Sequence, residues 1–217
     1  MDLDELGWND NLSSLQKKKD IIHLIPGRVS THSGKHYVVI TQEGEHNAIL
    51  SNTFLKLINT KSDIPTVGDW VGLEKNPEVN TYHIKFVFPR KNKLSRKVAG
   101  TKSEEQIIAS NIDIVFIMTS ADSDFNIRRL ERYLSMVYEI NAKPIIVINK
   151  IDKTKDYGKY RIKAEKISKD VHIITISVKD GRFIDEISKY IKNGKTIVLL
   201  GSSGVGKSTL INHLLGY

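Results

Sequence analysis

The sequence predicts two domains of different class, a small β-barrel followed by an α/β domain with a parallel sheet. Before position 90 the apolar runs are short and are broken by glycines and by Asn76-Pro77, roughly ten residues apart. Small barrels and sandwiches have this pattern. From Asn111 onward, nearly continuous runs of isoleucine and valine alternate with helical patterns. Such runs are typical of strands buried on both faces of a parallel sheet, so the boundary is expected between positions 90 and 110.

The first 90 residues divide into an N-terminal extension, expected over residues 1–20, and a barrel of the OB-like type over residues 21–90. The expected strands lie within IIHLIPGRV, HYVVI, HNAIL, DWVGL and YHIKFVF. Barrels of this type can stack nucleic-acid bases on exposed aromatic rings. Each ring here, taken singly, is better explained as part of the core. The aromatic residues concerned are Tyr37, Phe54, Trp70, Tyr82, Phe86 and Phe88.

A basic linker is expected over residues 91–110. The segment from Lys85 to Lys102 carries seven basic residues and no acid. Two interpretations stay open, because charged runs are commonly solvated linkers, whereas a basic run beside a barrel also suits contact with a nucleic-acid backbone. Under the second interpretation the candidate RNA-binding residues are Arg90, Lys91, Lys93, Arg96 and Lys97.

Residues 111–217 carry the expected parallel strands within IDIVFIM, PIIVIN, VHIITI and KTIVLLG. A helix is predicted after the first strand, behind a cap at Asp124 or Asn126, because four apolar residues there share one helical face. Those residues are Ile127, Leu130, Leu134 and Val137. Two further helices are expected over residues 157–168 and 183–192. The alternation of strand and helix defines the α/β class.

Composition restricts the functional classes. The net charge of +8 favours anionic partners, nucleic acid above all. The sequence has no cysteine, which excludes disulfides and thiolate metal sites within these residues and fits a reducing cytoplasm. No apolar run approaches the roughly 18 residues that cross a bilayer, and the acidic start MDLDELGWND does not resemble a secretory signal.

The segment GSSGVGKS, Gly201–Ser208, matches the phosphate-loop pattern G-x-x-x-x-G-K-[ST] at every fixed position. Its glycines let backbone N–H groups turn toward phosphate oxygens, Lys207 supplies positive charge for the β and γ phosphates, and the Ser208 hydroxyl is placed to bind Mg²⁺. An expected strand precedes the loop, and the helix that follows presents its positive end. The nucleotide-binding candidates are Gly201, Ser202, Ser203, Gly204, Val205, Gly206, Lys207, Ser208 and Thr209.

A second motif, Asn149-Lys150-Ile151-Asp152, follows the strand PIIVIN and resembles the NKxD element of GTPases. A carboxylate at Asp152 can accept two hydrogen bonds from guanine, and adenine offers no such pair of donors. After the next strand, the candidates Ser177, Val178 and Lys179 resemble the S-A-K element, whose backbone contacts the guanine oxygen. All three loops leave the carboxyl ends of strands, where α/β sheets bind ligands.

The order of these motifs is unusual, because GTPases ordinarily place the phosphate loop before NKxD. A tandem arrangement of two GTPase domains would need an earlier phosphate loop, and residues 1–148 contain none. Asp69-Trp70-Val71-Gly72 matches the DxxG element of GTPases but falls in the barrel, where we expect a strand preceded by a turn. We therefore interpret the domain as circularly permuted, since a parallel sheet can be cut and rejoined without changing the site.

With these motifs in place, the whole chain resembles the circularly permuted GTPases that act on the bacterial small ribosomal subunit, the RsgA/YjeQ type. The shared features are Gly7-Trp8, VGDWV, PRKNKLSRK, FNIRRLERYL, NKID and GSSGVGKSTLIN. The resemblance implies binding of GTP or GDP and Mg²⁺. It also implies slow GTP hydrolysis stimulated by the small subunit, a role late in that subunit's maturation, and contact of the barrel with ribosomal RNA. A monomer in the cytoplasm, without a membrane partner, is expected.

The resemblance also shows what these residues lack. Family members continue through the switch regions and DxxG into a zinc-binding domain, so we expect the domain over 111–217 to be incomplete at its C-terminus, and zinc to belong only to a full-length protein. The catalytic residue is unknown and expected beyond Tyr217, and the 217 residues alone are expected to be poorly active. Two alternatives stay open: a P-loop ATPase or kinase with an accidental NKxD, and a non-enzymatic RNA-binding module with a vestigial nucleotide domain.

Overall fold

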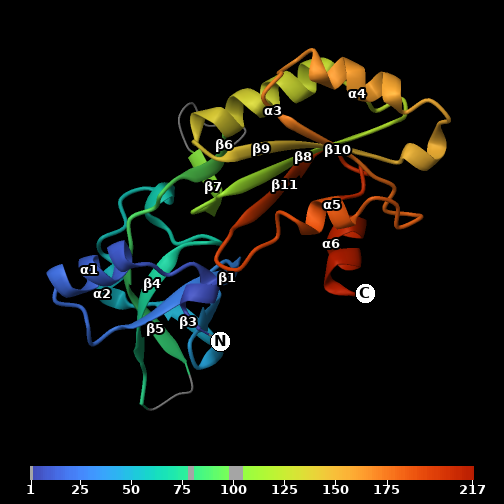
Figure 1. The fold of residues 1–217 in the computed structure, drawn as a ribbon. Helices are drawn as coiled ribbons and strands as arrows, with labels where there is room; N and C mark the ends of the chain where they lie inside the picture. The colour runs from blue at the N-terminus through green and yellow to red at the C-terminus, as the bar shows by residue number, and fades with distance from the viewer. Residues whose placement is uncertain (1, 78–80, 98–104) are drawn as a thin grey trace. The chain divides into compact units, whose positions relative to one another are not determined.

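The computed structural model describes residues 2–77, 81–97 and 105–217, which form two compact units (Figure 1). The first, here called the barrel unit, comprises Met1–Ile112 together with Asn193–Thr196. The second, called the α/β unit, comprises Asp113–Lys192 and Ile197–Tyr217. The boundary falls two residues later in the chain than expected, and the short segment near residue 195 belongs to the barrel unit.

A closed barrel with the strand order β1-β2-β3-β5-β4 forms the centre of the first unit. Neighbouring strands are antiparallel, except that β3 and β5 run parallel. This small closed barrel confirms the predicted OB-like class. The strands are β1 (Ile25–Ser33), β2 (His36–Thr41), β3 (Gly44–Leu50), β4 (Trp70–Lys75) and β5 (Tyr82–Val87).

The barrel interior is built by alternate residues of each strand, as the period of two requires. Along β2, Tyr37 and Val39 are buried, and the paired strand β3 contributes the small residue Ala48 beside Tyr37. Burial, with a further contribution from the negative charge of Asp69, raises the pKa of Tyr37 to about 12. The core cluster consists of Val29, Tyr37, Val39, Ala48, Val71, Leu73, Tyr82 and Ile84.

The segment expected as an N-terminal extension packs on the barrel through Trp8. Trp8 places its ring edge-on to Trp70 and Phe88, with centroid distances of 5.0 and 5.1 Å. Its indole N–H donates to the Ser13 hydroxyl at 2.7 Å, so both the apolar body and the polar edge of this side chain have partners. The short helices of this unit are η1 (Asp4–Leu6), α1 (Asp10–Lys18), α2 (Asn52–Leu55) and η2 (Lys61–Asp63).

The expected basic linker is largely an antiparallel ribbon of two strands, β6 (Lys93–Lys97) and β7 (Glu105–Ser110). Leu94, Ile107 and Ala109 are buried, so the ribbon has an apolar face as well as its basic residues. The segment expected as a basic linker over 91–110 thus contains two paired strands, which the sequence analysis did not predict. The alternation of apolar and polar residues in each strand is weak because the segment is rich in charged residues. The apolar face is recognised only when the two strands are considered together.

The α/β unit contains a fully parallel sheet in the order β10-β9-β8-β11. Every residue of β8 is buried, as the continuous apolar run predicted. Helices α3 and α4 lie on one face of the sheet and α5 and α6 on the other (Figure 1). The strands are β8 (Ile114–Ser120), β9 (Lys143–Asn149), β10 (His172–Thr175) and β11 (Ile197–Gly201).

The helices of this unit match the sequence pattern to different degrees. Helix α3 (Ile127–Glu139) begins where predicted, and the Asn126 side chain caps it by accepting from the backbone N–H of Arg129. Helix α4 (Gly158–Glu165) is shorter than the range expected for it, and α5 (Asp185–Ser188) is much shorter. The remaining elements are η3 (Ile151–Lys153) and α6 (Lys207–Leu215). No helix among the described residues has the length and apolar character that a membrane span requires.

Candidate nucleotide-binding site

The phosphate loop joins β11 to α6 and is shaped by its first and last glycines. A Cβ on Gly201 would lie 2.6 Å from the Met118 carbonyl oxygen, so only glycine lets β11 approach β8 this closely. Gly206 has a φ of 108°, and a Cβ there would lie 2.3 Å from the Asn149 amide nitrogen. The Lys207 ammonium donates to the carbonyl oxygens of Gly201 and Ser202 at 2.9 and 2.7 Å and thereby spans the loop.

The side chains of Ser203, Ser208 and Thr209 are exposed, as is Gly204, whereas Val205 is buried. The loop therefore presents polar groups outward and is anchored by one apolar residue. An open loop of this kind at a helix N-terminus suits an anionic ligand.

Asn149 connects the phosphate loop to the loop that follows β10. Its amide nitrogen donates to the Val205 carbonyl at 2.9 Å, and its amide oxygen accepts from the Val178 N–H at 3.1 Å. The side chain is almost fully buried, so each of these bonds satisfies groups that water does not reach. The structure thus brings the three sequence motifs together around one amide.

Asp152 is held by Ser177, whose hydroxyl donates to the carboxylate at 2.7 Å. This hydrogen bond, opposed by partial burial, keeps the pKa of Asp152 below its ordinary value. The backbone of Lys150 has a φ of 61°, which is uncommon for a residue other than glycine. Strained backbone of this type is concentrated at binding sites. Lys179 follows on an exposed position of the same loop as Ser177.

Two acidic residues that the motif analysis did not assign to the site belong to the loop between β8 and α3. Asp122 accepts from the Lys150 ammonium at 3.3 Å and from the Lys153 ammonium at 3.5 Å. Asp124 accepts from the Ser202 hydroxyl at 2.5 Å and pairs with Arg129 at 2.8 Å. The sequence signal for them was available, because this loop also leaves the carboxyl end of a buried strand. Asn126 alone caps α3, so the alternative cap at Asp124 was wrong.

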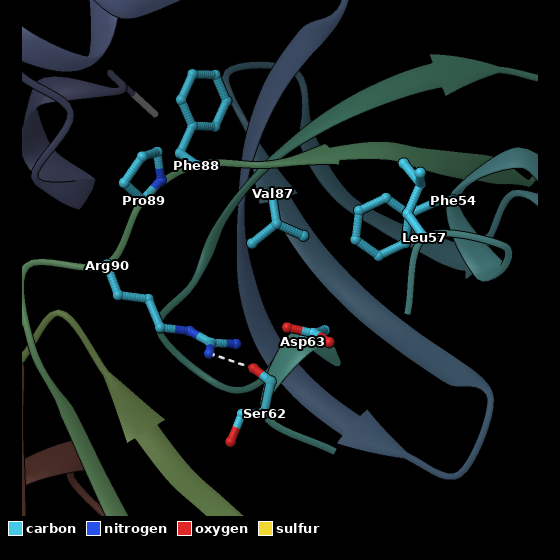
Figure 2. A pocket seen from close by; sticks show the side chains of 8 residues that line it. All are labelled: Phe54, Leu57, Ser62, Asp63, Val87, Phe88, Pro89 and Arg90. Carbon is cyan, nitrogen blue, oxygen red and sulfur yellow. Dashed lines mark hydrogen bonds between the residues drawn. The ribbon is translucent and has the colours of Figure 1, made fainter. Parts of the chain in front are cut away.

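Among the candidate RNA-binding residues, Arg90 differs from the expectation. Its guanidinium pairs with the fully buried Asp69 and donates to the carbonyl oxygens of Ser62 and Ile64. Figure 2 shows the bond to Ser62, at the edge of a cavity of about 330 Å³. Four of its five N–H groups thus have partners inside the barrel unit, which removes Arg90 from the candidate set.

The other basic candidates lie on or beside the ribbon. Arg96 is exposed and donates to the Gln106 side chain, Lys91 is exposed, and Lys93 is half-buried. The side chain of Lys97 lies outside the described part of the chain. Of the barrel aromatics, Tyr37, Trp70, Tyr82 and Phe88 are buried, which leaves Phe54 and Phe86 partly exposed.

The Asp69–Gly72 segment is a structural part of the barrel, as predicted from its position. Trp70 begins β4, and the Asp69 carboxylate also accepts from the Thr66 N–H at 2.8 Å. A fully buried carboxylate with internal partners is not available to a ligand. The match to DxxG is therefore accidental.

A parallel sheet with the NKxD and Ser177 loops before the phosphate loop defines a circularly permuted P-loop GTPase fold. A family model described as RsgA GTPase matches residues 87–217. The chain is 34% identical, over its whole length, to the small ribosomal subunit biogenesis GTPase RsgA of Opitutus terrae, and 42% identical over 88% of its length to RsgA 2 of Lactiplantibacillus plantarum. The chain belongs to the RsgA GTPase family.

Solved structures agree with this assignment. The crystal structure of YjeQ from Thermotoga maritima matches 87% of this chain and 64% of its own, with a TM-score of 0.69 and 26% identity. The structure of YloQ, titled a circularly permuted GTPase, has a TM-score of 0.66 at 24% identity, covers 88% of this chain and 64% of its own, and supports the fold. The chain covers 61% of the Opitutus relative and 54% of the Lactiplantibacillus relative.

Proposed function

We propose that this chain binds GTP and GDP between its phosphate loop and the two loops that follow β9 and β10. The observation that carries the proposal is Asn149, whose single amide connects the three loops. Asp152, with its lowered pKa, is ionised at neutral pH and accepts from the guanine N–H groups, while Lys150 packs on the base. The backbone of Ser177, Val178 and Lys179 contacts the guanine oxygen, and the phosphates occupy the loop from Gly201 to Thr209.

The Ser208 hydroxyl would hold Mg²⁺, with phosphate oxygens of the nucleotide and water as the remaining ligands. The donor set fits this ion, because Mg²⁺ keeps several waters and commonly takes few protein ligands beside nucleotide phosphates. Within the described ranges, no group of three or more histidine, cysteine and acidic side chains is arranged to hold a metal by itself. The nucleotide therefore supplies most of the metal's charged ligands. Any zinc site belongs to the part of the relatives that this chain does not span.

At the level of the whole protein, we propose slow GTP hydrolysis that the small ribosomal subunit stimulates, in the late maturation of that subunit. The relatives' names, small ribosomal subunit biogenesis GTPase, support the GTPase activity and the link to that subunit's biogenesis. The barrel unit contacts ribosomal RNA, and Lys91, Lys93, Arg96 and Lys97 provide the basic side chains for that contact. The hydrolytic residue lies in the part of the relatives beyond these residues, and the protein acts as a cytoplasmic monomer.

Competition between labelled GDP and ADP tests the nucleotide assignment. We expect strong preference for GDP, and Asp152→Asn shifts that preference toward xanthosine diphosphate, because an amide donor replaces a carboxylate acceptor. Equal affinity for GDP and ADP would favour a P-loop ATPase or kinase. An unchanged base preference in Asp152→Asn would contradict the role of this carboxylate.

A second experiment tests the enzymatic role with the full-length protein. GTP turnover is measured with and without purified small subunits, and we expect stimulation by the subunits. Turnover that is absent under both conditions would instead favour a non-enzymatic RNA-binding module.

A further inference from the structure

The loop between β8 and α3, residues 121–126, lies between the two halves of the proposed nucleotide site. In the sheet order β10-β9-β8-β11, strand β8 is the neighbour of both β9 and β11. The base loop follows β9 and the phosphate loop follows β11. Because the carboxyl ends of parallel strands meet at one edge, the loop after β8 adjoins both of them.

Asp122 connects this loop to the loop that follows β9, where the base is proposed to bind. One carboxylate oxygen accepts from the Ser120 hydroxyl at 2.7 Å and from the Asp124 N–H at 3.0 Å, which fixes the orientation of the carboxylate. The other oxygen accepts from Lys150 and Lys153. Burial alone would raise the pKa of Asp122, but these hydrogen bonds and the charge of Lys150 outweigh it and lower the pKa to about 2. The carboxylate is therefore a permanent anchor for the Lys150 ammonium at neutral pH.

Asp124 connects the same loop to the phosphate loop. Its carboxylate accepts from the Ser202 hydroxyl, in the first turn of the phosphate loop, and from Arg129 in the first turn of α3. Arg129 also donates to the Asp124 backbone carbonyl. Arg129 thus fixes the Asp124 carboxylate from the side of α3, and that carboxylate fixes the Ser202 hydroxyl.

The charges of this arrangement suit a polyphosphate ligand. An unpaired carboxylate beside the phosphate loop would repel the β and γ phosphates. Here Asp124 is matched by Arg129, and Asp122 by Lys150 and Lys153. The loop therefore uses two acids as hydrogen-bond acceptors without placing net negative charge near the phosphates.

We propose that Asp122 and Asp124 are positioning residues with separate tasks: Asp122 orients Lys150 for the base, and Asp124 orients Ser202 and the phosphate loop. This inference rests on the proposed guanine-nucleotide binding and adds residues outside the sequence motifs. The two tasks separate in the comparison of GDP with GMP, because the two ligands share the base and differ in the phosphate that the loop cradles.

The test measures GDP and GMP affinity of the full chain by fluorescence titration and competition. Asp124→Ala is expected to lower the ratio of GDP to GMP affinity about tenfold, the size of one hydrogen bond to a charged group. Asp122→Ala is expected to lower both affinities by about threefold and leave the ratio unchanged, as for a partly exposed ion pair. Asp170→Asn, which removes an equal charge from an exposed position of the same unit, is the matched control and should change neither value.

Ser202→Ala removes the hydrogen-bond donor of the Ser202–Asp124 contact and keeps the carboxylate. It therefore tests the same contact if Asp124→Ala fails to fold. It should reproduce the lowered ratio, and the double variant should lose no more than either single one. Equal losses of GDP and GMP affinity in Asp124→Ala, or additive losses in the double variant, would overturn the inference while leaving the proposed function intact. A wild-type chain that binds neither nucleotide would overturn both.

Discussion

The two units of this chain use acid–base pairs in opposite ways. In the barrel unit, Asp69 is fully buried, the side chain of Arg90 is partly buried, and each finds its partners within that unit. In the α/β unit, Asp122 and Asp124 pair with cations while about a fifth of the Asp122 side chain and a third of the Asp124 side chain stay exposed. The first pair holds segments between the barrel strands together, and the others hold loops that a ligand must still reach.

The difference teaches that charge in the sequence does not identify a binding residue. Arg90 lies in the most basic stretch of the chain, yet its guanidinium is structural. Lys150 and Lys153 do not lie in that basic stretch, yet both donate to the Asp122 carboxylate beside the proposed site. A structural charged residue differs from a binding residue by its burial, because a buried charged group must form its hydrogen bonds with internal partners.

The largest effect that tests this contrast is expected from Arg90→Ala. The change leaves Asp69 buried without its counter-ion, which typically costs about 3–5 kcal/mol of unfolding free energy. Denaturant unfolding of the purified chain measures the loss. The matched control is Lys85→Ala, because Lys85 pairs with Glu74 at 2.8 Å in the same barrel while both side chains are partly exposed. The control should lose less than about 1 kcal/mol. Similar losses in both variants would remove the basis of the comparison.

A smaller effect is expected from Asn149→Ala in the α/β unit. The substitution leaves the Val178 N–H and the Val205 carbonyl without their side-chain partner, and such buried groups cost about 1–3 kcal/mol each when unsatisfied. We expect a loss of about 2–3 kcal/mol in nucleotide-free protein, measured by denaturant unfolding. Asn212→Ala, at an exposed position of α6, is the control. An unchanged stability in Asn149→Ala would show that the three loops are held by other contacts.

The same contrast explains which parts of the fold the sequence predicted. Strands β8 and β9 and helix α3 were found because their signal is local: a continuous apolar run, or a stripe with helical spacing behind Asn126. The ribbon of β6 and β7 was missed because Leu94 is buried only through pairing with a strand more than ten residues away. Helix α5 was overestimated, since the residues after Ser188 form turns near the chain's return to the barrel unit.

The candidate site was predictable to a similar extent. The motif residues follow their strands as expected, because motif and strand are neighbours in the chain. The placement of Asp122 and Asp124 at the site depends on which strands are neighbours in the sheet. That order cannot be deduced from the order of the strands along the chain. The pairing of Arg90 was not predicted, because its partner Asp69 lies 21 residues earlier in the chain and the charge run around Arg90 does not indicate that contact.

Asp122 supplies a pH-dependent version of the comparison. Its pKa in the folded chain is about 2, below the ordinary value of 3.8, so its ionised form stabilises the fold. That contribution is complete above pH 4 to 5 and is lost as the pH falls through the folded-state pKa. We expect the difference in unfolding free energy between wild type and Asp122→Asn to be constant near neutrality and to shrink between about pH 4 and pH 2. Urea unfolding at stepped pH measures it. A difference that stays constant down to pH 2 would show that Asp122 is not held as an anion.

The smallest effect is expected from Ser177→Ala, which acts on the charge of Asp152 without removing the carboxylate. The Ser177 hydroxyl lowers the pKa of Asp152, so its loss raises that pKa toward the ordinary value. A protonated Asp152 loses one of its two acceptor positions for guanine, and GDP affinity should therefore begin to fall at a higher pH in the variant than in wild type. Near neutral pH both proteins carry the ionised group, so their affinities should differ only slightly.

Titration of GDP affinity from pH 7 down to pH 4 measures this shift, with Ser135→Ala as the control, because Ser135 is an exposed serine of α3. An acid limb that coincides with that of wild type would mean that Asp152 does not depend on Ser177 for its charge. The ionisation of the Asp152 carboxylate would then be set by solvent and not by the Ser177 hydroxyl.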